Sequence, residues 1–485
     1  MADAEVIARP PPDLDRPLGD LREALTEPFG AAGRRMAEQA AFLLDQAWVN
    51  GSAATAGPAL ERLRRLADGP EKACGEAYRE LLAIFAALGD RHTDACLPEP
   101  MGNQVAFLPF LARAFWEGGD RGLVITGAAA EGLERGDLLV AWDGRPIAEV
   151  LELHAARQLA ANAEARAAKA VQTLSFRPLA WLPPPDAEQV LLTLRRRNGR
   201  ERTVCLAWRL ASREALDERF GSWGEADGGL SARVVETAYG RFGVIRIARL
   251  HARPDVLLGE VIQALDGLPP DGVVIDLRGC EQGIVAAAEG LLQLFSPRTI
   301  QPQPFEFRIT PFVRDLVRTA RALAPWAPAV ETAAARGEAY SRGLPLTSPE
   351  AANAIGRRYF GPLIVLVDAL TYSSAEMFAA GVQDHGIGAV VGTAASTGGG
   401  GASPLTQDLL HRLSGRAALE PGPQQPILRV AARRCRRVGR NRSRLLEGVG
   451  ATPDQLHRPT LTDVLEGDRD LHRALASRLA QLRCD

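Results

Sequence analysis

A pair of serines, Ser373 and Ser374, lies between an apolar run and a helical pattern. The segment GPLIVLVDALTYSSAEMFAAGVQDHG (361–386) predicts a buried strand, a short turn and a helix that begins near Ser374. A serine at such a turn exposes its hydroxyl, and the first free N–H groups of the helix can face a developing oxyanion. Ser373 is therefore a candidate nucleophile, although a serine at this position can equally be a helix N-cap.

Few other side chains could carry chemistry. The thiol of Cys280 has no basic neighbour in sequence that would favour a thiolate. The glycines at 398–401 could cradle a phosphate, but the terminal Gly-Lys-Ser/Thr of a P-loop is missing, so we expect a flexible wall of a substrate cleft. The only lysines are Lys72 and Lys169, so a lysine-dependent mechanism has two candidates.

The segment RVAARRCRRVGRNRSR (429–444) is densely basic. We expect a solvated strand or hairpin, and the alternative is a basic rim that attracts an acidic peptide or a C-terminal carboxylate. No aromatic residues are interleaved with the arginines, which argues against nucleic-acid binding.

Four motifs, taken in order along the chain, resemble signatures of the tail-specific protease superfamily. They are GVVIDLRGCEQG, VLVDALTYSSAEMFAAGVQD, VVGTAASTGGGG and LLEGVGATPDQ, and the resemblance covers roughly residues 80 to 480. It implies a serine peptidase with a crotonase-like α/β core, a PDZ domain and a helical region.

The resemblance also implies roles for particular residues. The nucleophile of the family precedes the glutamate of its serine motif by three places, which corresponds to Ser373 ahead of Glu376. The segment ALGDRHTDA resembles the histidine motif of the tricorn-like branch, so His92 would be the general base. In that branch a glutamate orients the base, and LLEGVGATPD supplies Glu447.

A serine and lysine dyad, which a bacterial branch uses, has no matching residue. The lysine of that branch lies in the stretch equivalent to 397–401, which here contains only threonine and glycine. Lys169 falls in the PDZ-like region and Lys72 in the helical region, so neither is expected at the site.

The oxyanion hole is where the chain departs from the family pattern. In DLRGCEQG, Cys280 replaces an asparagine and Gln282 replaces the first of two paired glycines, while Gly283 remains. We expect the backbone N–H groups of Ser374 and Gly283 to be the donors. Glutamine tolerates positive φ poorly, so the loop could be remodelled.

The remaining histidines have simpler interpretations. His385 follows the nucleophile helix, where a cation at the helix C-terminus is favourable. We expect surface or capping roles for five others, His154, His251, His411, His457 and His472. Asp276 and Arg278 are expected to form a buried pair that braces the end of a strand.

The elements that position these residues fall into three predicted regions. Residues 1–100 form a helical region that carries His92, after a loose proline-rich arm at 1–20. Residues 101–210 form a β-rich domain with hairpin signals at 143–144 and 198–199, and GLERGDLLVAWDGRPIAEVLELHAARQL resembles a PDZ domain, which binds an extended peptide.

Residues 211–485 alternate apolar strands with amphipathic helices. This pattern predicts the fold class α/β, with a mainly parallel sheet and flanking helices as the crotonase-like protease core. The proline-rich stretch at 301–345 is expected to be an insertion or a covering loop.

Composition limits the class of protein. The hydrophobic fraction of 46% and the charged fraction of 24% are globular values, and the net charge of -2 indicates no particular partner. Neither a leader nor a membrane-spanning run is evident, and the 6 cysteines lack paired spacing. We therefore expect a cytoplasmic protein without metal or cofactor, acting on a peptide or protein, with no membrane partner and a possible homo-oligomeric state.

Two alternatives remain open from the sequence. One is a catalytically inactive peptide-binding scaffold of the same fold, in which the altered DLRGCEQG loop no longer stabilises an oxyanion. The other is a crotonase-type acyl-CoA enzyme, which the PDZ-like region and the matches at His92 and Glu447 disfavour.

Overall fold

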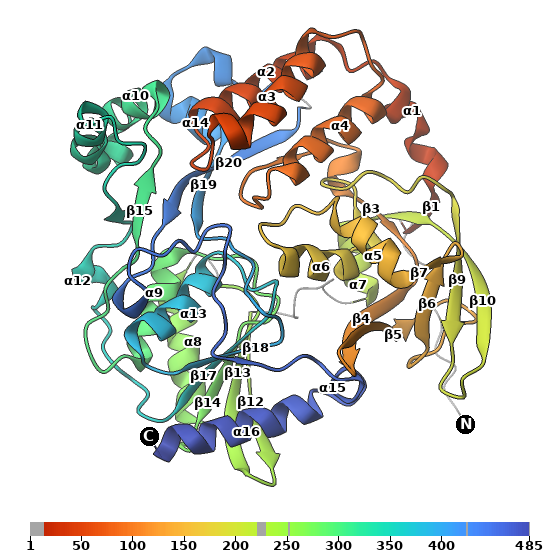
Figure 1. Ribbon diagram of the computed structural model, residues 1–485, viewed down its shortest axis with the longest axis vertical. Coiled ribbons are helices and arrows are strands. Elements are labelled where there is room, and N and C mark those ends of the chain that lie inside the picture. The colour runs from red at the N-terminus through yellow and green to blue at the C-terminus, as the bar shows by residue number, and fades with distance from the viewer. Residues whose placement is uncertain (1–13, 221–228, 251–252, 423–424, 485) are drawn as a thin grey trace.

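The computed structural model describes residues 14–220, 229–250, 253–422 and 425–484. Figure 1 shows N-terminal helices at the top, a β-rich part on the right, and a sheet with helices at the lower left. The described residues form a mixed α/β fold with four sheets. In this part of the chain, no helix has both the length and the apolar character that crossing a bilayer requires.

The predicted N-terminal helices are confirmed. They are α1 (Arg22–Thr26), α2 (Gly30–Gln46), α3 (Ala53–Asp68) and α4 (Cys74–Ala87). Their apolar faces bury Met36, Leu63 and Leu81 completely, and α3 begins at a capping box formed by Ser52 and Thr55. The expectation of a loose arm at 1–20 is wrong for its second part, because β1 (Leu14–Pro17) pairs with β11 (Arg209–Ser212). Residues 1–13 lie outside the described residues.

The β-rich part contains two sheets. Its elements are β3 (Gln104–Phe107), β4 (Phe110–Glu117), β5 (Asp120–Ala128), β6 (Leu138–Trp142), β7 (Arg145–Pro146), α5 (Ile147–Ala155), α6 (Ala163–Gln172), β8 (Phe176–Pro178), β9 (Gln189–Arg195), β10 (Glu201–Ala207) and α7 (Arg213–Phe220). One sheet has the order β1-β11-β3-β8 and the other β10-β9-β6-β5-β4, with β7 on β6.

Both predicted hairpins are present. Asp143 and Gly144 connect β6 to β7 with φ of 49° and 75°, the positive values that a two-residue turn of this kind requires. Gly199, with φ of 80°, lies in the loop between β9 and β10.

The main sheet belongs to the C-terminal half. Its strands are β12 (Leu230–Thr237), β13 (Gly240–Ile247), β14 (Val273–Asp276), β17 (Leu363–Val367), β18 (Ala389–Gly392) and β21 (Gln455–Leu456), in that order. The ladders from β13 to β21 are parallel and β12 is antiparallel, which confirms the predicted mainly parallel sheet. Because both faces are covered, β17 is the unbroken apolar run LIVLV.

Helices lie on both faces of this sheet (Figure 1). The hydrophobic core on one face of the sheet contains side chains of α8 (Pro254–Asp266), α9 (Val285–Phe295) and α13 (Ser374–His385). The core on the other face contains side chains of α16 (Arg469–Cys484). Two short helices, α12 (Pro349–Ala352) and α15 (Leu461–Leu465), lie in the connections.

The expected insertion or covering loop at 301–345 is instead a structured part of a fourth sheet. It contains β15 (Pro304–Phe307), α10 (Pro311–Thr319), α11 (Ala327–Ala335) and β16 (Leu344–Pro345). The sheet has the order β16-β15-β20-β19, from β19 (Ala402–Thr406) and β20 (Ile427–Cys435), with β2 (Asp94–Cys96) also on β20 and α14 (Gln407–Ser414) following β19. Side chains of α10, α11 and β20 share one hydrophobic core with α2, α3 and α4.

Over its first half, the basic segment at 429–444 forms neither the expected solvated strand nor the alternative, a basic rim open to an acidic peptide. Strand β20 lies between β15 and β19, and Arg433, Arg434 and Arg437 are buried. Arg434 donates to Glu306 at 2.7 Å, and Arg437 donates to Asp384 at 2.9 Å. Arg434 and Arg437 are thus neutralised inside the fold by acids distant in sequence, while Arg433 donates to Ser403 and lies over the Trp326 ring.

We expect Phe312→Ala to lower the free energy of unfolding by about 3–5 kcal/mol, the usual cost of emptying a buried phenylalanine site. Phe312 is 1% exposed and makes an edge contact with Phe42 of α2 at 5.2 Å between ring centroids. The measurement is urea unfolding followed by circular dichroism. Phe360→Ala is the matched control: Phe360 is 75% exposed, so its loss should cost below about 1 kcal/mol. Equal urea midpoints for the Phe312 and Phe360 variants would contradict a hydrophobic core shared by α10 and α2.

Candidate active site

The turn that carries Ser373 has a strained backbone. Ser373 has φ of 59° and ψ of -129°, a region that residues other than glycine rarely occupy and that costs on the order of 1–3 kcal/mol. Ser373 lies at the N-cap position of α13, yet its side chain makes no capping hydrogen bond. The simple N-cap interpretation therefore fails, and the half-buried hydroxyl is available for chemistry.

Hydrogen bonds around Asp368 hold this turn in place. One carboxylate oxygen of Asp368 accepts the N–H groups of Gly279 and Leu370, each at 3.0 Å. The Thr371 hydroxyl donates to the carbonyl of Leu277 at 2.9 Å. The nucleophile turn is thereby fastened to the loop that follows β14.

The predicted base, His92, lies in a buried loop between α4 and β2. It is 5% exposed, and Asp90 accepts its backbone N–H at 2.7 Å. Asp90 also accepts the Trp48 indole N–H at 2.6 Å and the Thr93 hydroxyl at 2.8 Å. Burial, together with the positive charges of Arg429 and Arg91, lowers the pKa of His92 well below its ordinary value, so the ring is neutral and able to accept a proton.

The predicted acid, Glu447, lies beside this histidine. Nitrogen and oxygen atoms of His92, Asp90 and Glu447 lie within 4.8 Å of one another, and all three residues are buried. His92 Nδ1 and one carboxylate oxygen of Glu447 have no hydrogen-bond partner among the described residues. Within that part of the chain, these three residues are also the one group of histidine, cysteine and acidic side chains close enough to hold a metal ion.

Burial and mutual repulsion disfavour the charged forms of the two acids in this cluster. Burial first, and then the charges of Asp90 and Glu376, raise the pKa of Glu447 well above its ordinary value. Burial also raises the pKa of Asp90, against the hydrogen bonds that it accepts. An imidazolium at His92 would relieve this repulsion between acids.

The residue before the candidate nucleophile contacts the candidate base. The rings of Tyr372 and His92 are 4.7 Å apart between centroids. Tyr372 also packs against Gly398 and Gly400, where any added Cβ would clash with its ring. The structure thus brings His92 and Glu447 together and places the Ser373 turn beside them.

The two predicted oxyanion donors also lie together. A Cβ on Gly283 would clash with the Ser374 hydroxyl and with Leu250, so only glycine fits there. Leu250 bonds the carbonyl of Gln282 and the N–H of Ile284, each at 3.1 Å, and strand alternation turns the Gly283 N–H away from Leu250. Gln282 is absent from the positive-φ residues of the described chain, so the replacement of glycine there causes no strain.

The glycine run is fixed rather than flexible, which corrects the expectation for residues 398–401. The carboxylate of Glu376, which is fully buried, accepts the N–H groups of Gly399 at 2.7 Å and Gly400 at 2.5 Å, and also the Thr397 hydroxyl. Burial raises the pKa of Glu376 to about 7 against these hydrogen bonds. The glutamate of the serine motif therefore fastens the glycine loop to the nucleophile helix.

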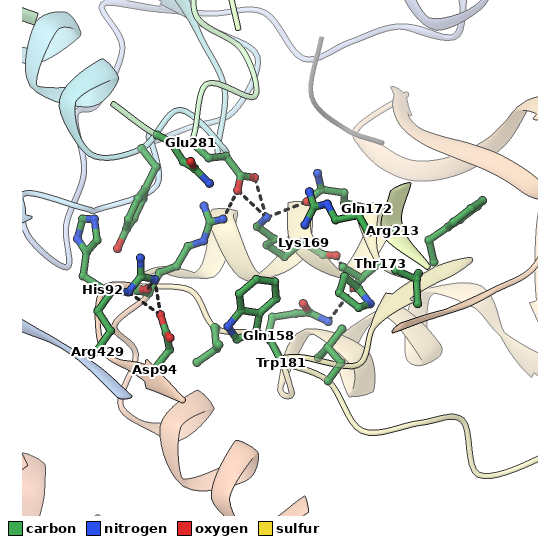
Figure 2. A pocket seen from close by; sticks show the side chains of 18 of the residues that line it. His92, Asp94, Gln158, Lys169, Gln172, Thr173, Trp181, Arg213, Glu281 and Arg429 are labelled. Atoms are coloured by element: carbon green, nitrogen blue, oxygen red, sulfur yellow. Dashed lines mark hydrogen bonds and ion pairs between the residues drawn. The ribbon is translucent and has the colours of Figure 1, made fainter. Parts of the chain in front are cut away.

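Lys169 lies beside the active site, contrary to the expectation from sequence. Its ammonium donates to both oxygens of Glu281, at 2.6 and 2.9 Å, and Arg91 pairs with the same carboxylate. Figure 2 shows Lys169 reaching Glu281 across a cavity of about 240 Å³ that His92 and Tyr372 also line. Three regions thus meet at Glu281, which belongs to the altered DLRGCEQG loop.

The carboxylate of Glu281 is paired with two cations, Arg91 and Lys169. Burial would raise the pKa of Glu281, but Arg91 and Lys169 outweigh it and hold that pKa below its ordinary value. Burial and the repulsion of Arg91 lower the pKa of Lys169 to about 8, despite the attraction of Glu281. One carboxylate therefore serves two cations. No sequence pattern indicates this contact.

Two histidine expectations are corrected. His154 is buried rather than at the surface, it bonds the Thr173 hydroxyl at 2.9 Å, and burial lowers its pKa to about 3. His385 accepts the Gln301 N–H at one nitrogen and donates to the Gly381 carbonyl at the other, which fits a neutral ring rather than a cation.

The other three described histidines are half-buried and make polar contacts. They are His411, His457 and His472, which contact the Arg416 carbonyl, Asp463 and Arg233. His251 lies outside the described residues.

Two further expectations agree with the structure. Asp276 and Arg278 form the expected buried pair at the end of β14, with contacts at 3.0 and 2.8 Å. Burial raises the pKa of the Cys280 thiol to about 12, which leaves no thiolate for chemistry.

Comparisons with known proteins bear on one region of the sequence and on the fold. Residues 241–420 match the model of peptidase family S41. No curated protein matches the chain in sequence. The crystal structure of mature CPAF is similar in fold, with a TM-score of 0.70 and 16% identity over 93% of this chain and 97% of that chain. CPAF complexed with lactacystin gives the same TM-score and identity, over 93% of this chain and 98% of that chain.

The tricorn protease is a more distant structural relative. Its TM-score is 0.36 at 15% identity, over 93% of this chain and 37% of that chain, which is too low to carry an argument. In sequence, residues 241–420 therefore resemble peptidase family S41. The CPAF likeness, at this identity, shows the fold.

We expect Glu281→Gln to destabilise the protein by about 3–5 kcal/mol, because it leaves two buried cations without their acid. Lys169→Met should cost less, since Arg91 still neutralises Glu281. Urea unfolding measures both. The control is Glu61→Gln, which removes an exposed pair with Arg65 and should cost below about 1 kcal/mol. A Glu281 variant as stable as this control would show that the contact adds nothing.

Proposed function

We propose that the chain is a serine endopeptidase or C-terminal processing peptidase that forms an acyl-enzyme on Ser373. The observation that carries this proposal is the buried cluster of His92 and Glu447, with the ring of Tyr372 placing the Ser373 turn against it. The strained backbone of Ser373 and the match to family S41 support it.

In the proposed mechanism the Ser373 hydroxyl attacks the scissile carbonyl while His92 takes its proton. The N–H groups of Ser374 and Gly283 donate to the tetrahedral oxyanion, and Glu447 stabilises the imidazolium, with Asp90 adding a second negative charge. His92 then protonates the leaving amine, and water, deprotonated by His92, hydrolyses the acyl-enzyme.

Several finer assignments belong to the same proposal. Residues 101–210 would act as a PDZ-like peptide-binding domain, 1–100 as the helical region of the base, and 211–485 as a crotonase-like core. The branch would be tricorn-like, with a histidine and a glutamate rather than a lysine. A cytoplasmic location and a homo-oligomeric state complete the proposal.

We expect Ser373→Ala to abolish labelling by a fluorophosphonate probe and to lower peptide hydrolysis by about 10⁴-fold or more. Ser374→Ala is the matched control, because it removes a neighbouring hydroxyl and keeps the backbone N–H of the oxyanion hole. It should label and turn over within about tenfold of the wild type. Labelling of the Ser373→Ala variant would exclude Ser373, and an unlabelled wild type would favour the inactive scaffold.

The pH profile tests the proposed base. A general base must be neutral, so activity falls as pH falls through its pKa. Because burial and two arginines lower the pKa of His92, we expect the acid limb of kcat/KM to have its midpoint below 6.5, the ordinary value for histidine. The measurement is kcat/KM for one peptide between pH 4 and 9. A midpoint at or above 6.5 would mean that the base is a solvated group.

A further inference from the structure

A second and larger cavity opens on the other side of α6 from the first. Its volume is about 640 Å³, and its walls are the β4–β5 hairpin, α6 and the carboxyl ends of β14, β17 and β18. Six arginines and four acids line it, a formal excess of two positive charges. The arginines are Arg113, Arg121, Arg233, Arg246, Arg278 and Arg458.

Three of these arginines are neutralised within the fold. Arg246 and Arg278 both pair with Asp276, at 3.2 and 2.8 Å. Arg458 makes two contacts with Glu164, at 2.9 and 3.0 Å. These acids are therefore already in use and cannot balance the other cations.

Of the other two acids, Asp468 pairs with Arg278 at 2.7 Å, and Asp368 is also in use. Its carboxylate accepts the N–H groups of Gly279 and Leu370 in the loops behind the cavity, and burial raises its pKa. No lining acid thus remains for Arg113 or Arg121.

The guanidinium groups of Arg113 on β4 and Arg121 on β5 make no hydrogen bond or ion pair with any described residue, whereas their backbones pair in the β4–β5 ladder. Desolvation by the cavity walls first, and then the positive charge of Arg278, lower the pKa of Arg113, although the residue is exposed overall and the charges of Asp468 and Asp368 partly oppose these effects. A guanidinium with free N–H donors recognises carboxylates through paired hydrogen bonds. The cavity therefore offers two unused carboxylate-binding groups, beside Arg233, which donates to His472 at 3.2 Å.

The cavity lies close to the candidate nucleophile along the chain. Ala369 and Leu370, which begin the turn that leads to Ser373, line it, while Tyr372 lines the smaller cavity and Gln172 lines both. Four residues of extended chain span at most about 14 Å, so Ser373 is within that distance of the wall at Ala369. A polypeptide with its scissile bond at Ser373 can reach the cavity with a residue about four positions away.

We infer that Arg113 and Arg121 select polypeptide substrates that carry an acidic side chain within about four residues of the cleaved bond. The occupant is a substrate aspartate or glutamate, whose carboxylate would receive the free guanidinium N–H groups. This inference rests on the proposed peptidase function and adds the substrate class to it.

The test is a set of fluorogenic peptides that are identical except for one position. Glutamate, glutamine and lysine are placed in turn at each of four positions on either side of the cleaved bond, and kcat/KM is measured. We expect the wild type to prefer glutamate to glutamine by about tenfold to a hundredfold at one or two positions, and the preference to shrink as salt is raised.

Variants identify the arginines responsible. Arg113→Gln and Arg121→Gln should each lower the ratio of kcat/KM for the glutamate peptide to that for the glutamine peptide, and Arg113→Glu should turn the preference toward lysine. Arg64→Gln is the matched control, because Arg64 is exposed on α3 and outside the cavity lining. It removes the same charge and should leave the preference intact.

Binding separates this inference from the proposed chemistry. The fluorescently labelled glutamate peptide is titrated into the Ser373→Ala variant, with and without Arg113→Gln, and anisotropy is read. Weaker binding without Arg113 supports the inference whatever the turnover. Cleavage and binding that are equal for glutamate and glutamine peptides would overturn the inference and leave the peptidase proposal standing. Absence of both labelling and turnover in the wild type would instead overturn the peptidase proposal.

Discussion

The hydrogen bonds that Asp90 accepts determine where the base lies, and the rest of the active site depends on that position. Its carboxylate is buried, yet it accepts donors from Trp48, Thr93 and the backbone of His92. These donors favour its charged form, and that charge in turn raises the pKa of Glu447. Two neighbouring buried acids are stabilised by one cation between them. The proposed reaction supplies that cation at the moment when His92 takes a proton, so the ground-state repulsion favours the transition state.

Segments that are distant in sequence meet around the ring of Tyr372. Its ring lies against His92, Arg91 lies over it at 5.3 Å, and the glycine run packs on it. Strand β2, directly after His92, pairs with β20, which leads on to the loop of Glu447. One ladder therefore brings together the segments of the proposed base and the proposed acid, although more than 300 residues separate them in sequence. Because β2 and β20 belong to the fourth sheet, the closeness of His92 and Glu447 does not depend on the main parallel sheet.

Local patterns in the sequence predicted the elements well but not their partners. The strand, turn and helix around Ser373 follow from the apolar run and the onset of helical spacing, and they are where we expected them. The arginines of the basic segment at 429–444 are expected to be solvated because the acids that pair with Arg434 and Arg437, Glu306 and Asp384, are far away in sequence. Lys169 was set aside for the same reason, since nothing near it indicates that α6 reaches the loop of Glu281. Charge compensation between distant segments is a tertiary property, which periodicity does not encode.

Helix α6 is the wall between the two cavities, and its contacts explain why both keep their shape. At its start, the Asn162 amide donates to the Thr397 carbonyl at 2.7 Å. In its first turn, Glu164 pairs with Arg458, and in its last turn, Lys169 pairs with Glu281. Each contact joins the β-rich part to a different loop of the catalytic half. A shift of α6 would therefore change the large cavity and the loop of Gly283 together, so the part of the chain that would bind substrate is physically connected to the part that would stabilise the oxyanion.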